Sequence, residues 1–175
     1  MNQLRRIVRL KVNGHEHEVY VRHADTLLDV LREELGLTAA KRGCDLGTCG
    51  CCTVQIDGEP ILSCLYLAAE AEGKEIVTVE ALAGKERFSP LQRAWAEAGA
   101  SQCGFCTPGF LMTADALLRS KADPSRQEIR EALSGNLCRC TGFVKILDAV
   151  EQSAAKHREF QASENRSQTA TEAGN

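Results

Sequence analysis

The sequence has few aromatic residues and no long apolar segment. Aromatic side chains make up 5% of the 175 residues, so aromatic packing cannot dominate the core. No apolar stretch approaches the ~20 residues that a membrane-spanning helix requires. A twin arginine, Arg5 and Arg6, stands near the N-terminus. Arg9 and Lys11 then interrupt the apolar run that a signal peptide needs. We therefore expect a cytoplasmic protein without a membrane partner.

The sequence also lacks a concentrated basic region. Its 21 Lys and Arg residues are outnumbered by 24 Asp and Glu residues, which gives a formal net charge of −3. Proteins that bind nucleic acid usually carry a basic face, so we expect no nucleic-acid partner. Hydrophobic residues at 43% and charged residues at 26% are typical of a soluble globular protein.

The first half of the sequence predicts a compact α+β unit. Strands are expected around residues 8–12, 19–21, 54–56, 61–62 and 76–79. The pairs Asn13-Gly14 and Asp57-Gly58 favour tight hairpin turns between neighbouring strands. One helix is expected after the first hairpin, capped by Asp25 or Thr26 and ended by Gly36.

The second half has helical periodicity. Helices are expected over residues 91–98, 107–118, 125–134 and from 141 to about 150. Thr107-Pro108 is expected to cap and begin the second of these, and Ser125 with Glu128 fits a capping box for the third. The sequence therefore predicts a first domain at 1–83 and an all-helical domain at 84–160. Residues 161–175 lack large aliphatic or aromatic side chains and are expected to be disordered.

Nine cysteines stand out in a chain of this kind. In a reducing compartment they are better explained as metal ligands or catalytic residues than as disulfides. The first set comprises Cys44, Cys49 and Cys52, spaced CxxxxCxxC, and Cys64 twelve residues further on. This is the spacing by which plant-type ferredoxins hold a [2Fe-2S] cluster. Glycines at positions 43, 47 and 50 allow the loop to wrap closely around such a cluster.

Cys51 is left over by this spacing. It is expected to point away from the cluster as a small buried apolar residue. A register that uses Cys51 in place of Cys52 would give CxxxxCxC and crowd the loop. A structural zinc is the other alternative, although zinc sites usually use two separated CxxC-like pairs.

The second set comprises Cys103 and Cys106 in QCGFCTPGF, and Cys138 and Cys140 in GNLCRCTGF. A CxxC and a distant CxC are by themselves also compatible with zinc. Both pairs stand directly before predicted helices, whose N-terminal amides favour an anionic centre. An oxidised [2Fe-2S] cluster with four thiolates is formally about −2, so this placement favours iron and sulfide.

The two sets together, CDLGTCGCCT followed by QCGFCTPG and GNLCRCTG, resemble the small iron–sulfur subunit or N-terminal region of the molybdenum hydroxylases. That family includes xanthine dehydrogenase, aldehyde oxidoreductase, aerobic carbon monoxide dehydrogenase and 4-hydroxybenzoyl-CoA reductase. The resemblance covers residues 4–157. It implies a ferredoxin-like β-grasp domain, whose cluster lies farther from molybdenum, and a helical domain, whose cluster lies nearer the molybdopterin of a large subunit.

The resemblance also implies that Gln102 and Cys140 approach the molybdopterin from this side. Two positions depart from the family's usual residues. Cys51 stands where Ala or Ser is common, and Phe143 stands where Tyr is common. Loss of the tyrosine hydroxyl would shift the potential of the second cluster slightly.

The resemblance implies an electron-transfer subunit without a substrate site of its own. Electrons from a molybdenum centre would pass through the second cluster to the first, and then to FAD in a medium subunit or to another acceptor. The complex would be a heterotrimer or a dimer of heterotrimers. Its substrate would be an aromatic, N-heterocyclic, purine, aldehyde or aromatic acyl-CoA compound. The stretch from residue 125 to 146 most resembles the branch of 4-hydroxybenzoyl-CoA reductase and related aromatic or heterocycle-oxidising enzymes.

Two other hypotheses stay open at this point. The chain is alternatively a free-standing two-cluster ferredoxin or redox sensor, or a zinc-stabilised interaction module. Among single residues, His15 and His17 are expected to face water on an edge strand, and Trp95 is expected to pack in the core or an interface. Arg139 either offsets cluster charge or is solvated.

Overall fold

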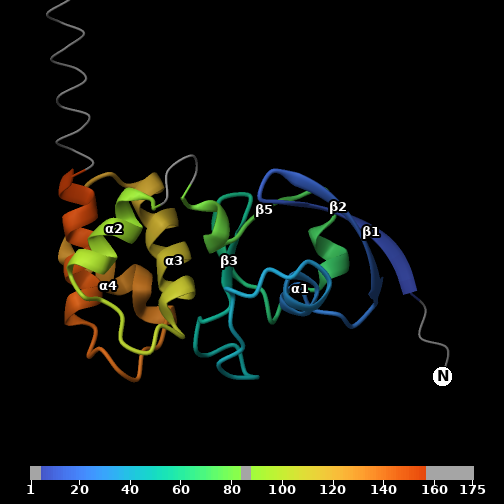
Figure 1. Cartoon of the computed structure of the whole chain (residues 1–175), viewed down its shortest axis with the longest axis horizontal. Coiled ribbons are helices and arrows are strands. Elements are labelled where there is room, and N and C mark those ends of the chain that lie inside the picture. The colour runs from blue at the N-terminus through green and yellow to red at the C-terminus, as the bar shows by residue number, and fades with distance from the viewer. Residues whose placement is uncertain (1–4, 84–87, 157–175) are drawn as a thin grey trace, which may run out of the picture.

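The computed structural model describes residues 5–83 and 88–156. A sheet-containing half and a helical half lie side by side (Figure 1). The strands are β1 (Arg5–Val12), β2 (His15–Arg22), β3 (Thr53–Ile56), β4 (Glu59–Leu62) and β5 (Glu75–Val77). The first half also contains α1 (Leu27–Asp29), the π-helical turn η1 (Val30–Glu34) and the 3-10 turns η2 (Ala68–Ala71) and η3 (Val79–Ala81). The second half contains α2 (Pro90–Glu97), α3 (Thr107–Ser120), α4 (Arg126–Ala132), the 3-10 turn η4 (Leu133–Gly135) and a helix over residues 144–156.

The five strands form one mixed sheet in the order β2-β1-β5-β3-β4. β1 and β5 run parallel, and the other neighbouring pairs are antiparallel. Asn13 and Gly14 both have positive φ, at 53° and 78°, and so do Asp57 and Gly58, at 52° and 90°. Both expected hairpin turns are thereby confirmed. The sheet packs around α1 and η1, which is the predicted α+β arrangement.

The helix after the first hairpin is shorter than expected. Thr26 is its cap, since the Thr26 hydroxyl accepts a hydrogen bond from the Asp29 N–H at 3.2 Å. After Asp29 the chain widens into a π-helical turn, in which the Leu35 N–H donates to the Val30 carbonyl at 3.1 Å. Four apolar side chains of this segment are buried against the sheet: Leu27, Leu28, Val30 and Leu31. Each contributes about 1.5–3 kcal/mol by leaving water.

Two other boundaries differ from the expected ones. β5 ends at Val77, because the Thr78 N–H donates to the side chain of Asn13 at 2.9 Å instead of continuing the sheet. The last helix begins at residue 144 rather than 141, because Gly142 and Phe143 both have positive φ, at 67° and 70°. The predicted tail at 161–175 and the start of the predicted second domain at 84–87 lie outside the described residues.

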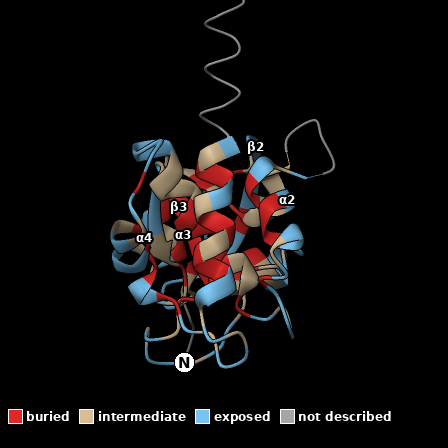
Figure 2. Cartoon of the chain, turned by 90° about the vertical axis from the view of Figure 1, so that its left-hand side faces the viewer, coloured by how far each residue is buried: buried red, intermediate tan, exposed pale blue. Residues whose placement is uncertain are grey.

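The helical half is built around α3. Residues 109–114 of α3 are buried, and Figure 2 shows red positions on this helix, with β3 behind it. Ser89 and Ser125 close capping boxes at the starts of α2 and α4, and the second of these was predicted. Thr107 was the expected cap of α3, but Cys106 is its N-cap residue and Thr107 is the first helical residue.

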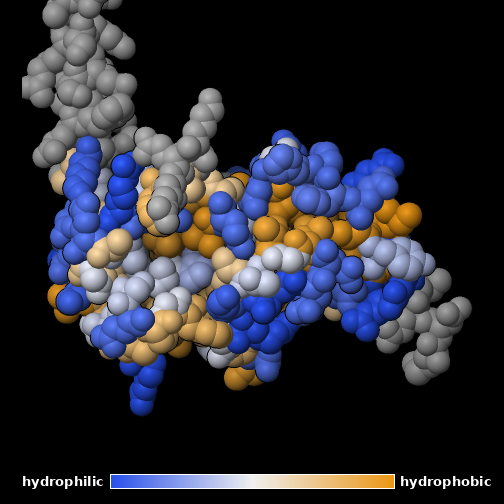
Figure 3. Space-filling model, viewed as in Figure 1, coloured by the Kyte–Doolittle hydropathy of each residue, from blue (hydrophilic) through white to orange (hydrophobic). Residues whose placement is uncertain are grey.

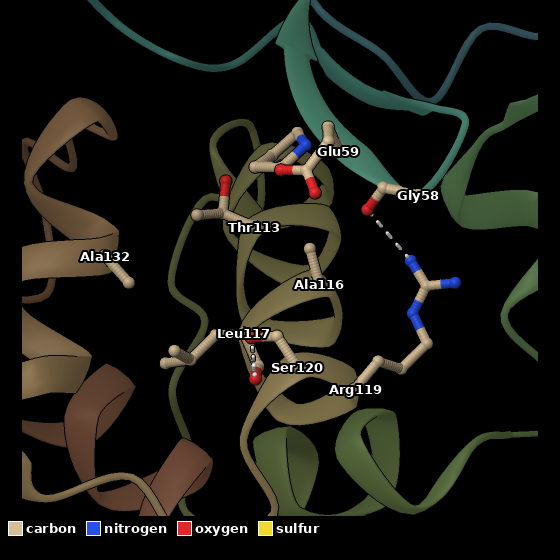
Figure 4. A pocket seen from close by; sticks show the side chains of 9 residues that line it. Gly58, Glu59, Thr113, Ala116, Leu117, Arg119, Ser120 and Ala132 are labelled. Atoms are coloured by element: carbon tan, nitrogen blue, oxygen red, sulfur yellow. Dashed lines mark hydrogen bonds between the residues drawn. The ribbon is translucent and has the colours of Figure 1, made fainter.

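The two halves are joined by a buried polar contact between β3 and α3. Gln55 on β3 is fully buried, and its amide donates to the Met112 carbonyl at 2.8 Å and to the Asp115 carboxylate at 3.0 Å. The Arg119 guanidinium donates to the Gln55 side-chain oxygen and pairs with Asp115 at 3.1 Å. Arg119 also reaches the Gly58 carbonyl across a groove of about 430 Å³ (Figure 4). This network fixes α3 against the sheet.

We expect Gln55→Leu to lower the free energy of unfolding by about 1–3 kcal/mol, because it leaves buried partners on α3 without their hydrogen bonds. Urea denaturation of the cluster-loaded chain measures the change. Gln127→Leu, at an exposed helical position, is the matched control and is expected to change stability by less than about 0.5 kcal/mol. Equal stability of the two variants would contradict this account of the interface.

Candidate iron–sulfur centres

The first set of cysteines lies in the segment between η1 and β3 and just after β4. The Ser63 hydroxyl donates to the Cys52 carbonyl at 2.7 Å, which ties the segment of Cys64 to that of Cys52. Burial, together with the neighbouring thiols of Cys52, Cys44 and Cys49, raises the pKa of Cys64 to about 12. The structure therefore brings together the four side chains that the spacing selected.

Backbone N–H groups point at the first of these sulfurs. The N–H groups of Leu46 and Thr48, together with the Thr48 side chain, lower the pKa of Cys44 to about 6. The Thr48 N–H lies 3.4 Å from the Cys44 sulfur. The loop reaches this path through Gly47 and Gly50, which have positive φ of 69° and 68°. Such donors stabilise negative charge on a ligand sulfur.

Cys51 and Cys52 point in opposite directions. Cys52 belongs to the core of the first half, whereas Cys51 packs in the core of the helical half, beside Cys106. Burial and the neighbouring thiols of Cys49 and Cys106 raise the pKa of Cys51 to about 12. The Cys51 sulfur nevertheless lies near that of Cys49. Both sulfurs are next to Gly43: a Cβ added to this glycine would lie 3.1 Å from the Cys49 sulfur and 3.2 Å from the Cys51 sulfur.

The second set is held by the segments before α3 and before the helix at 144–156. The sulfurs of Cys103 and Cys140 lie 3.6 Å apart, too far for a disulfide bond. Burial, followed by the Cys138 thiol, raises the pKa of Cys106 to about 12. These interactions bring all four side chains together, and all nine cysteines of the chain are free thiols.

Thr141 places an N–H group beside a sulfur of the second set, as Thr48 does in the first set. Its N–H lies 3.4 Å and its hydroxyl 3.1 Å from the Cys138 sulfur. Burial opposes ionisation of Cys138, but the two Thr141 donors, the Cys140 N–H and the Cys106 thiol together outweigh it, so the pKa of Cys138 is lowered. In Cys140 the neighbouring Cys103 thiol raises the pKa.

The chemistry of each donor set fits a two-iron cluster, because thiols lie close together and N–H groups point at their sulfurs. Within residues 5–83 and 88–156, no group of three or more His, Cys, Asp or Glu side chains is placed to hold one metal ion. A structural zinc would require four ligand atoms about 2.0–2.3 Å from a single centre. A [2Fe-2S] cluster spans two irons and two sulfides, so its four thiolates stand farther apart. Four converging thiols with N–H donors at their edges match this requirement twice.

One edge of the second set is open to solvent. Cys103 and Cys140 are exposed there, and Gln102, which precedes Cys103 in the chain, is exposed as well. Three apolar residues within four positions of a cysteine of this set, Phe105, Leu137 and Val144, are exposed too. Figure 3 shows apolar (orange) atoms at the surface of both halves, among charged residues.

The single-residue expectations can be compared with the structure. Trp95 is buried, donates to the Ser101 hydroxyl at 3.0 Å and packs against Phe110, so its role in core packing is confirmed. β2 is an edge strand, on which His15 is exposed and His17 is half-buried. Arg139 is exposed.

Phe143 packs its ring against Phe110, with ring centroids 5.9 Å apart. Phe143 is partly buried and packs against the helical core, three residues after Cys140, so a tyrosine hydroxyl would extend from the edge of this core. Sequence reasoning missed Asn136, which is buried two residues before Cys138. A polar residue inside the GNLCRC motif was the only available signal for it.

Comparisons with known proteins agree with this geometry. Residues 10–83 match the family described as 2Fe-2S iron-sulfur cluster binding domain, and residues 78–151 match the [2Fe-2S] binding domain. The chain is 46% identical over 149 residues to the nicotinate dehydrogenase small FeS subunit of Eubacterium barkeri, covering 85% of this chain and 95% of that subunit. It is 48% identical over 141 residues to the xanthine dehydrogenase iron-sulfur-binding subunit of Escherichia coli O157:H7, covering 79% and 88%.

A solved structure extends the comparison to three dimensions. Quinoline 2-oxidoreductase from Pseudomonas putida 86 contains a chain that superimposes with a TM-score of 0.85 at 46% identity. The match covers 89% of this chain and 97% of that one. The expected fold class is confirmed by this similarity.

We expect Cys51→Ser to retain about four iron atoms per chain and Cys52→Ser to retain about two, because Cys52 interacts with Cys64 of the first set, whereas Cys51 is buried in the helical core. Iron and acid-labile sulfide analysis, with visible absorption, measures both. The two variants are matched controls for each other, since the residues are adjacent and both buried. Loss of a cluster in Cys51→Ser would support the alternative register, and zinc in place of iron would exclude both registers.

Proposed function

We propose that two sets of four cysteines hold two [2Fe-2S] clusters in this chain. The chain belongs to the family of small iron–sulfur subunits of the molybdenum hydroxylases. The chain is the electron-transfer subunit of a molybdopterin-dependent oxidoreductase. The proposed ligands are Cys44, Cys49, Cys52 and Cys64 for the first cluster, and Cys103, Cys106, Cys138 and Cys140 for the second. The convergence of eight thiols in two separate groups carries the proposal.

Each cluster, when bound, accepts and releases one electron at a time. The protein contributes the environment of the sulfurs. Thr48 and Thr141 direct N–H groups at Cys44 and Cys138, and such donors favour the more negative, reduced state. The buried side of Cys106 lies at the N-terminus of α3, whose dipole favours the same state.

We propose that the open edge of the second set faces the molybdopterin of the large partner subunit. Gln102 and Cys140 are both exposed there and would contact the pterin, so that Cys140 would serve cluster and pterin together. The exposed apolar side chains of Phe105, Leu137 and Val144 support this orientation, because a partner that covers them also excludes water from the electron path.

We propose that electrons leave from the first cluster to FAD in a medium subunit. Leu46 and Leu65 flank the first cysteine loop and are 80% and 63% exposed. These side chains give an acceptor subunit an apolar surface beside the cluster. The resulting complex would be a heterotrimer or a dimer of heterotrimers. Within it, this chain would consist of two domains, at residues 1–83 and 84–160.

The substrate site would lie in the large subunit. Relatives named for nicotinate, xanthine and quinoline all refer to N-heterocyclic compounds. We propose an N-heterocycle as the substrate of the complex that contains this chain. This agrees with the heterocycle-oxidising branch that the residues around Cys138 resemble.

We propose that the complex works in the cytoplasm, where thiols stay reduced before cluster insertion. The described parts of the chain contain no helix that is long and apolar enough to cross a membrane. All nine cysteines are free, which fits a reducing compartment.

We expect substrate to reduce both clusters only in the assembled complex. When the complex is purified through a tag on this chain, anaerobic addition of its N-heterocyclic substrate should bleach the visible absorption of the clusters. The isolated chain, as control, should be bleached by dithionite and not by substrate. Reduction of the isolated chain by substrate would contradict the assignment, and an isolated monomer with no binding partners would favour a free-standing ferredoxin.

We expect Gln102→Ala to slow reduction of the clusters by substrate about tenfold, which corresponds to the loss of one hydrogen bond near the electron path. Reduction by dithionite and the iron content should stay unchanged. Stopped-flow absorption of the complex measures both rates. Gln152→Ala, at an exposed site on the last helix, is the control. A rate unchanged by Gln102→Ala would contradict the proposed pterin contact.

A further inference from the structure

The loop of the first set touches the segment that carries the second. The Leu137 N–H donates to the Cys49 carbonyl at 2.9 Å. The Asn136 amide donates to the Gly50 carbonyl, also at 2.9 Å, across 86 residues of sequence. On one side of both hydrogen bonds is Cys49, a proposed ligand of the first cluster, or the residue next to it. On the other side is a residue one or two positions before Cys138, a proposed ligand of the second cluster.

Asn136 is held on both ends of its side chain. It is 3% exposed, and its oxygen lies 2.9 Å from the hydroxyl of Thr113 on α3. The Gly50 carbonyl can only accept a hydrogen bond, so the side-chain nitrogen of Asn136 must face it. One buried side chain thus connects α3, the segment before Cys138 and the first cysteine loop.

The Gly50 carbonyl does not depend on Asn136 for a partner. It also accepts hydrogen bonds from the Thr53 N–H at 3.2 Å and from the Thr53 hydroxyl at 2.7 Å, both within the first half. Removal of the Asn136 amide therefore leaves this carbonyl satisfied. What is lost is one of the hydrogen bonds between the halves, while the Leu137 N–H still donates to the Cys49 carbonyl. This separates a positioning role of Asn136 from a role in folding the loop.

The surrounding packing leaves little room for another arrangement. A Cβ on Gly109, in the first turn of α3, would collide with the Gly50 carbonyl oxygen. A Cβ on Gly50 would collide with the Gly135 carbonyl. The loop thus lies in direct backbone contact with both segments that carry the second set.

We propose that Asn136 is a positioning residue that sets the separation and orientation of the two clusters. This inference depends on the ligand sets proposed above. Magnetic coupling between two reduced clusters, and electron transfer between them, both weaken steeply with distance. A loop that shifts when the Asn136 link is removed would change the coupling while each cluster keeps its own four ligands.

The test uses the purified complex, fully reduced with dithionite, and low-temperature EPR of the interaction between the clusters. In Asn136→Ala we expect about four iron atoms per chain, as in the wild type, and a smaller magnetic splitting. Thr113→Val removes the hydroxyl partner of Asn136 and is expected to reduce the splitting less. Freeze-quench EPR should show that electron transfer from the second cluster to the first is slower in both variants than in the wild type, and slowest in Asn136→Ala.

Asn13→Ala is the matched control, because Asn13 also links two segments, through hydrogen bonds to Thr78 at 2.9 and 3.0 Å, but only within the first half. It should leave the splitting unchanged. Unchanged splitting in Asn136→Ala with full iron content would overturn the inference, as would equal loss in Asn13→Ala. If Asn136→Ala loses a cluster, the splitting of Thr113→Val is the test instead, and an unchanged splitting in that variant overturns the inference. A wild-type chain without iron would overturn the proposed function itself.

Discussion

The contact between the first cysteine loop and the helical half is the constraint on which the rest of the structure depends. Gly50 lies against the first turn of α3 with no space for a side chain between them. Cys51 is buried in the helical core, while its neighbour Cys52 is buried in the sheet core. One loop therefore belongs to both cores, and the two halves cannot separate without exposing it.

This arrangement explains how the fold itself positions each set of thiols. In each set, a threonine directs its N–H at a sulfur, and part of the set lies at the edge of a packed core. Preorganised donors need little rearrangement when the charge of a cluster changes, and small rearrangement favours fast electron transfer. The hydrogen bonds of Gln55 and Arg119 fix α3 against the sheet, at β3 and at the turn between β3 and β4.

Local features of the fold could be predicted because their causes are local. Asn13-Gly14 makes its turn through its own backbone angles, and Ser125 caps α4 through a residue three positions away. The cysteine spacing similarly carries its own geometry. The contacts of Gln55 with α3 and of Asn136 with Gly50 could not be predicted, since each joins segments more than fifty residues apart. Nor could the start of the last helix, because Phe143 adopts a positive φ that large side chains rarely adopt.

The central claim is that eight thiols of this chain hold two separate two-iron clusters. Mössbauer spectroscopy of the iron-enriched complex tests it most directly. As isolated, all iron should occur in antiferromagnetically coupled ferric pairs, resolved into two sets of equal intensity. On full reduction each pair should gain one ferrous site. Mononuclear iron, a four-iron cluster or a single set of pairs would contradict the account.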